Sequence, residues 1–137
     1  MKTKNNKIFL PIGIFAVALL FAVSTSFDAE DIRSNINSAI KSGNAQQLSP
    51  YLNSTVEMNV LGNEGYFSKL QATSILSDFF KNNSPKNFEV KQGGSNTENT
   101  KFSIGNYTAS TGIFKIYYVV KKENSTELIH KFTIEKK

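Results

Sequence analysis

The sequence contains no cysteine, and this absence excludes four kinds of protein at once. Without a thiol the chain cannot carry a lipoprotein anchor, a disulfide scaffold, thiol redox chemistry or a zinc site built from thiolates. The domain must therefore be held together by packing alone. Aromatic residues can supply that core, because eight phenylalanines and five tyrosines follow residue 26.

A basic surface suited to nucleic acid is also missing. The chain has 16 Lys and Arg against 11 Asp and Glu, which gives a formal net charge of +5. Three of the basic residues precede residue 27, so the rest of the chain has a net charge of only +2. The two lysine pairs, at 121–122 and 136–137, are not interleaved with aromatic residues. We therefore expect no nucleic-acid partner.

No apolar run reaches the length of about 20 residues that a membrane-spanning helix needs. The longest run, Ile8–Val23, is shorter and follows three lysines at positions 2, 4 and 7. Small polar residues end it, and this order is typical of a secretory signal peptide. Ser24 and Ser26 have the spacing that a signal peptidase reads, which predicts cleavage after Ser26. Cleavage after Ser24 and an uncleaved N-terminal anchor are the alternatives.

The signal segment predicts both the location and the domain organisation. We expect a signal peptide over residues 1–26 and a single α+β domain over residues 27–137. The domain would be exported, to the periplasm or the extracellular space. It would meet the membrane only through the signal segment before cleavage.

Three helices are predicted in the first half of this domain. Apolar residues recur at helical spacing through Asp28–Ser42, and Gly43 is expected to end that helix. Asn44 is expected to cap a short second helix, which Pro50 interrupts. The third begins at a capping box, in which Ser68 and Gln71 each bond the other's backbone, and runs to about residue 82.

In most of the remaining sequence apolar and polar side chains alternate, which indicates strands. The run 113–122 is instead apolar on both faces, which predicts a central strand covered on both sides. A strand at 56–60 and a short return at 66–67 precede the third helix. Four consecutive strands follow Pro85, at 88–92, 102–108, 113–122 and 128–134, with a polar loop over 93–100. Gly105 would mark a bulge or a close approach of another chain segment. Short connections between consecutive strands favour antiparallel pairing.

This element order predicts an α+β fold in which helices pack on a strongly curved antiparallel sheet. The segment Gly62–Phe80 (GNEGYFSKLQATSILSDFF) and the final strands resemble a family of small exported bacterial domains of unknown function. The wider resemblance is to the nuclear transport factor two-like superfamily, with its cone-shaped, cystatin-like fold. It implies a pocket inside the cone, between helices and sheet, and its structural motifs imply no activity.

Enzymes of that superfamily, such as ketosteroid isomerases and small dehydratases, place Asp, His or Tyr inside the pocket. In this sequence no carboxylate is predicted to face inward, so a general base has no candidate among the acids. His130 is the only histidine and lies on an apolar strand face. One histidine and no cysteine give no metal site, and we expect no cofactor.

Two sets of residues are candidates for binding. The aromatic residues and the histidine could line the cone pocket: Tyr51, Tyr66, Phe80, Tyr118 and His130. Apolar residues of the last two strands could form an interface on the second face of the sheet: Ile113, Tyr117, Val119 and Ile129.

The leading hypothesis is a non-catalytic binding or interaction module that uses the cone pocket or the exposed sheet face. Its partner would be a small apolar ligand or a protein, and a homodimer is slightly favoured over a monomer. The alternative hypothesis is a small-molecule lyase or isomerase that uses His130 with a neighbouring tyrosine.

Overall fold

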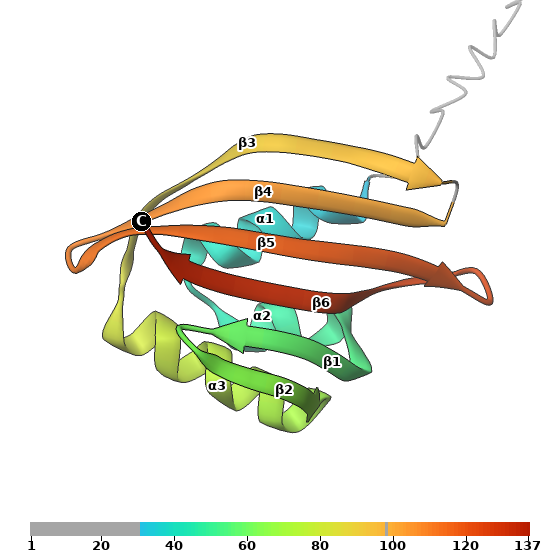
Figure 1. Ribbon diagram of the computed structural model, residues 1–137, viewed down its shortest axis with the longest axis horizontal. Coiled ribbons are helices and arrows are strands. Elements are labelled where there is room, and N and C mark those ends of the chain that lie inside the picture. Colours follow the sequence, from blue (N-terminus) through green and yellow to red (C-terminus); the bar gives the residue numbers. More distant parts are fainter. Residues whose placement is uncertain (1–30, 98) are drawn as a thin grey trace, which may run out of the picture.

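The computed structural model describes residues 31–97 and 99–137 as a six-stranded sheet with helices on one face (Figure 1). The predicted signal peptide and the first residues of the helix expected from Asp28 lie outside this range. No helix within it is long and apolar enough to cross a bilayer. The elements, in chain order, are α1 Ile32–Ser42, α2 Ala45–Leu48, the 3-10 turn η1 Ser49–Tyr51, β1 Leu52–Val60, β2 Asn63–Ser68, α3 Lys69–Asn82, β3 Pro85–Thr97, β4 Thr100–Ala109, β5 Gly112–Glu123 and β6 Thr126–Lys136.

Local sequence signals set the ends of α1 and α2. The Asp31 side chain accepts a hydrogen bond from the backbone N–H of Arg33 and caps α1. Gly43 ends α1 in the left-handed region at φ +63°, as predicted. The Asn44 side chain accepts from the backbone of Gln47, which confirms it as the cap of α2.

The capping box of α3 is also confirmed. The Ser68 hydroxyl accepts from the backbone N–H of Gln71, and the Gln71 side chain accepts from the backbone N–H of Ser68. The helix ends at Asn82, as expected. Its buried face presents Phe79 and Phe80 to the sheet, where both rings contact Tyr107.

The strands follow the order β2-β1-β6-β5-β4-β3, and four of the five pairings are antiparallel. The exception is the parallel pairing of β1 with β6, with Met58 opposite Phe132 and Val60 opposite Ile134. The sheet is therefore mixed rather than wholly antiparallel. This pairing joins the early hairpin to the last strand, so the rule for consecutive strands does not apply to it.

The segment expected as a polar loop over 93–100 instead continues β3 to Thr97 and starts β4 at Thr100. The strand continues because Gly93 pairs with Ser103 and Gly94 pairs with Phe102 of β4. A Cβ on Gly94 would lie 2.9 Å from Cε1 of Phe102, so the ring would have to move, whereas a Cβ on Gly93 would lie 3.3 Å from Nη1 of Arg33. Glycine at these positions lets the Phe102 ring and the Arg33 side chain approach the backbone.

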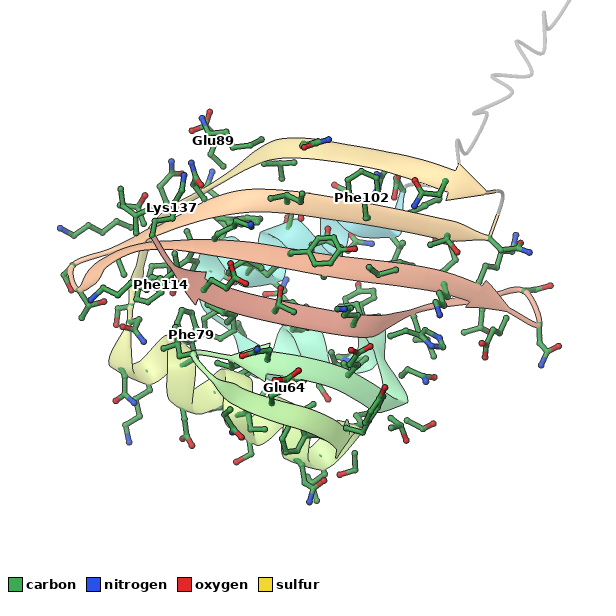
Figure 2. The ribbon with its side chains drawn as sticks, in the orientation of Figure 1. Glu64, Phe79, Glu89, Phe102, Phe114 and Lys137 are labelled. Carbon is green, nitrogen blue, oxygen red and sulfur yellow. The ribbon has the colours of Figure 1, made fainter. Side chains whose placement is uncertain are left out.

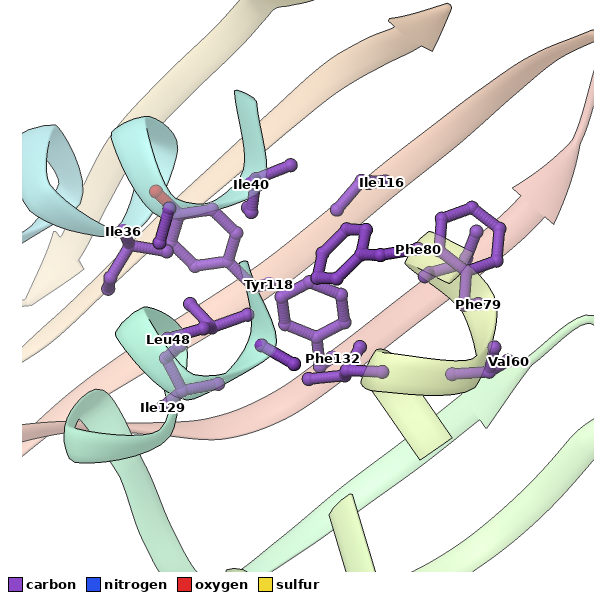
Figure 3. Packing of buried hydrophobic residues seen from close by; sticks show 14 of the residues in the cluster. Ile36, Ile40, Leu48, Val60, Phe79, Phe80, Ile116, Tyr118, Ile129 and Phe132 are labelled. Carbon is purple, nitrogen blue, oxygen red and sulfur yellow. The ribbon is translucent and has the colours of Figure 1, made fainter. Parts of the chain in front are cut away.

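The core lies between the helices and the inner face of the sheet (Figure 3). Tyr118 and Phe132 are fully buried there, with their rings stacked at 6.1 Å. The Tyr118 hydroxyl donates to Oδ1 of Asn37 at 2.6 Å, which satisfies a phenol that water cannot reach. Side chains therefore fill the interior of the cone around these two rings.

A register shift in the last strand corrects one predicted interface residue. Val119 pairs with Lys131, but Val120 pairs with Ile129, so His130 has no partner across the ladder. The extra residue exchanges the two faces for the residues that precede it in the strand. Ile129 therefore points to the inner face and is fully buried. Its placement on the outer face was wrong, because the sequence pattern gave no sign of the bulge.

Candidate functional site

The outer face of the sheet carries the surface best suited to binding, because α1, α2 and α3 all lie behind the other face (Figure 1). The cross-strand register places Ile104, Tyr117 and Thr133 in one row over β4, β5 and β6. Phe102 and Val119 stand beside them in the next row, and Figure 2 shows Phe102 on this face. Tertiary pairing thus brings together side chains from three strands.

Four of these residues, all except Val119, line a shallow hollow of about 460 Å³. The rings of Phe102 and Tyr117 lie 6.5 Å apart and are tilted by 55°. Ile104 adds an aliphatic side chain, and all three are only half-buried. The remaining lining residues are polar or charged: Asn96, Lys115, Thr133 and Glu135. An apolar centre with a polar rim is the usual composition of a binding surface.

Two ion pairs flank the apolar centre. Nζ of Lys115 lies 3.8 Å from Oε2 of Glu135, and Nζ of Lys131 lies 3.5 Å from Oε1 of Glu57. All four side chains are substantially exposed, so the pairs contribute little to the stability of the fold. They do place charges of both signs beside the hollow.

An arginine on the inner side holds α1 against the strands that carry the hollow. Nη1 of Arg33 donates to the carbonyl oxygens of Gly94 at 3.3 Å and Phe102 at 3.1 Å. Its Nη2 donates to Asp31 at 2.7 Å, and this bonding lowers the pKa of the Asp31 carboxyl. The sequence analysis did not identify Arg33, because the two acceptors on the strands are backbone carbonyls more than 60 residues away.

The five residues proposed for a cone pocket do not line one cavity. Phe80 and Tyr118 are buried in the core, whereas Tyr66 lies on the edge strand β2 and is 74% exposed. Tyr51 is half-buried in η1, and His130 is half-buried on β6. The structure brings Phe80 and Tyr118 into the same cluster, packs Tyr51 against its margin, and leaves Tyr66 and His130 outside it.

The contacts of His130 and Tyr118 do not assemble an acid–base pair. Within residues 31–97 and 99–137, the His130 side chain makes no hydrogen bond or ion pair. Burial raises the pKa of Tyr118 to about 12, so its phenol stays protonated at neutral pH and donates to Asn37. In the same part of the chain, no group of three or more metal-binding side chains occurs.

Three of the predicted interface residues do lie on the outer face. Tyr117 and Val119 are half-buried there, and Ile113 is exposed farther along β5. Phe102 and Ile104 were missed as site residues. Their alternation identified a strand, but the register that places them beside Tyr117 is set by the β4–β5 pairing.

The fold belongs to the nuclear transport factor two-like, or cystatin-like, class. A protein of unknown function from Shewanella baltica OS155, described as NTF2-like, is 8% identical, has a TM-score of 0.60 and covers 77% of this chain and 88% of its own. A domain of unknown function with a cystatin-like fold from Nostoc punctiforme PCC 73102 is 14% identical, has a TM-score of 0.61 and covers 82% and 79%. These likenesses concern the fold alone.

The chain belongs to the family described as domain of unknown function DUF4783, whose match spans residues 33–135. A DUF4783 family protein from Bacteroides uniformis ATCC 8492 is 25% identical and has a TM-score of 0.75. The alignment covers 78% of this chain and 98% of that protein. No curated protein matches the sequence.

Proposed function

We propose that this domain is an exported, non-catalytic interaction module that binds a second copy of itself through the outer face of the sheet. The observation that carries the proposal is the hollow around Phe102, Ile104 and Tyr117, on a face that no described helix covers. Exposed apolar surface of this kind marks interaction sites more often than it stands alone.

The composition of the surface supports a protein partner. Interfaces bury aromatic and aliphatic side chains at their centre and keep charged groups at the rim. Here the two rings and Ile104 form the centre, and Lys115 and Glu135 stand at the rim. The inner face offers no comparable site around Tyr118, because that ring is fully buried.

The charges favour a second copy as that partner. In a two-fold pair the same patch meets itself, so a lysine of one copy can lie beside a glutamate of the other. Both signs are present beside the hollow, in the pairs Lys115–Glu135 and Lys131–Glu57. A patch with one sign alone would repel its own copy.

Export is the second element of the proposal, and it rests on the order of charge, apolar run and small residues within positions 1–26. Intact-mass measurement on protein recovered from the cell envelope tests it. A mass that begins at residue 27 or 25 supports export with cleavage. A mass that retains residues 1–26 supports the anchored alternative.

Self-association is tested by comparing two glutamate substitutions in the chain of residues 27–137. Tyr117→Glu places a charge at the centre of the outer face, whereas Leu70→Glu places one on α3, at a side chain that is 82% exposed. Sedimentation velocity should give a dimer for the parent and for Leu70→Glu, and a monomer for Tyr117→Glu. A monomeric parent at high micromolar concentration would refute the pairing. So would a dimer that survives Tyr117→Glu with its fold intact.

A further inference from the structure

The sheet has two edge strands, β3 and β2, and β3 carries three devices against further pairing that β2 lacks. Edge strands are usually blunted by bulges, lysine or proline. β3 has all three, with register shifts at three places and with Pro85, Lys86 and Lys91 in its sequence. β2 has none of them, and its register with β1 runs unbroken from Asn63 to Ser68.

Exposed apolar side chains are concentrated in the part of the sequence around β2. Five large hydrophobic residues are exposed in the part of the chain that the structure describes. Three of them lie within ten residues around β2. Leu61 is in the turn before the strand, Tyr66 is in the strand, and Leu70 is in the first turn of α3.

The hairpin geometry determines which backbone groups face outward. Leu61 and Gly62 both have positive φ, 53° and 90°, which is typical of the two-residue turns that close hairpins on a hydrogen-bonded pair. That pair is Val60 with Asn63. Along the rest of β2, the backbone N–H and C=O groups of successive residues therefore point alternately toward β1 and toward the open edge. The backbone N–H and C=O of Glu64 and Tyr66 therefore point to the open edge.

We infer that the open edge of β2 accepts an extended segment of a partner protein, which adds to the sheet as a seventh strand. The backbone groups of Glu64 and Tyr66 provide the hydrogen bonds, as in other cases of strand addition. The inference concerns a different surface from the outer-face hollow and does not depend on it.

The side chains on this edge define the chemistry of the partner. Glu64 and Tyr66 project from the same face of β2, since they are two residues apart. Glu64 forms no ion pair within residues 31–97 and 99–137, and Figure 2 shows it standing on β2. A partner strand with a basic residue beside Glu64 and an apolar residue beside Tyr66 satisfies both. A second copy would present another Glu64 and no cation, so it fits this edge less well.

A palindromic probe peptide, acetyl-Thr-Val-Thr-Lys-Thr-Val-Thr-amide with a fluorescent label, tests the inference in either strand direction. The control peptide has Glu in place of Lys. Fluorescence anisotropy with the chain of residues 27–137 should show binding of the lysine peptide and at least about tenfold weaker binding of the glutamate peptide. The Glu64→Lys variant should reverse this preference.

Two variants of Tyr66 separate strand addition from simple side-chain contact. Tyr66→Pro removes an edge-facing N–H and leaves the bonds to β1, whereas Tyr66→Thr keeps that N–H. The proline variant should lose peptide binding, and the threonine variant should retain it at reduced affinity. Circular dichroism and thermal unfolding establish that both variants fold.

Three results would overturn the inference. The first is that the parent chain binds neither peptide at millimolar concentration. The second is that Glu64→Lys and a folded Tyr66→Pro variant bind the lysine peptide as the parent does. The third is a dimer of the parent that Tyr66→Pro dissociates, because the edge would then pair two copies of this chain.

Discussion

Gly105 should be the least replaceable glycine of the sheet, because two neighbouring residues of β3, Phe88 and Glu89, lie against it. A Cβ at this position would stand 2.6 Å from Cε2 of Phe88, 2.7 Å from its Cζ and 2.8 Å from the carbonyl oxygen of Glu89. Phe88 is buried, and the Glu89 oxygen belongs to the backbone of the paired strand. Neither neighbour can withdraw without disturbing the core or the ladder.

Gly105→Ala should therefore lower the free energy of unfolding. Overpacking of this kind costs about 1–3 kcal/mol, and the smaller entropy of the unfolded alanine chain offsets about 0.4–1 kcal/mol. We expect a net loss of about 1–2 kcal/mol. Gly65→Ala is the matched control, since it lies in another strand and its new Cβ would meet Phe67 at an ordinary 3.4 Å.

Urea unfolding at equilibrium measures the difference. The midpoint should fall for Gly105→Ala at unchanged slope, and it should stay near the parent value for Gly65→Ala. Phe88→Leu removes the two nearest ring atoms and should restore part of the loss in the double variant. Free energies of unfolding within about 0.5 kcal/mol of each other for the two alanine variants would refute the packing argument.

Three further changes test the fold. Phe79→Ala should cost about 3–5 kcal/mol in urea unfolding, because the ring is buried among other rings, and a cost below about 1 kcal/mol would contradict this. Ser68→Ala should cost about 1 kcal/mol through loss of the α3 cap, whereas Ser77→Ala, on the exposed side of α3, should cost about 0–0.5 kcal/mol. Hydrogen bonding from Arg33 lowers the pKa of the Asp31 carboxyl in the folded protein. The bond therefore stabilises the fold fully at pH values above the carboxyl's unfolded pKa of about 4, and this stabilisation is lost as the pH falls through the lower pKa of the folded state. The destabilisation by Asp31→Asn, under about 1 kcal/mol at neutral pH for this partly exposed pair, should therefore shrink in acid, and a loss that is constant down to pH 2 would contradict the assignment.

The features predicted correctly from the sequence are those that depend on neighbouring residues. The caps at Asn44 and Ser68 involve partners three residues away, and the left-handed end at Gly43 depends on the missing side chain. The central position of β5 followed from its two apolar faces, but the expected cover on both of them was wrong, since the helices cover only the face with Tyr118 and leave Tyr117 half-buried. Patterns of this kind involve residues that are close together in the sequence, so they can be recognised without knowledge of the tertiary structure.

The features that were missed depend on contacts between distant segments. The parallel pairing of β1 with β6 joins residues more than 70 positions apart, and the bulge at His130 is a property of the β5–β6 pair. Gly93 and Gly94 were expected to form a loop, because their close neighbours Arg33 and Phe102 are not adjacent in sequence. The hollow was only partly predicted for the same reason, because its residues come from different strands. Tyr117 was a candidate, but Phe102 and Ile104 were not.

The central claim, that two copies pair through the outer face, is tested most directly by distances between spin labels. Because the chain contains no cysteine, one introduced cysteine places a single label on each copy. Thr108→Cys labels the outer face away from the lining of the hollow, and Leu70→Cys labels α3 on the other side of the sheet. Pulsed electron–electron double resonance should give a dipolar signal in both variants, with the shorter distance for the label at position 108. The absence of a dipolar signal, or a shorter distance for the label at position 70, would contradict the account.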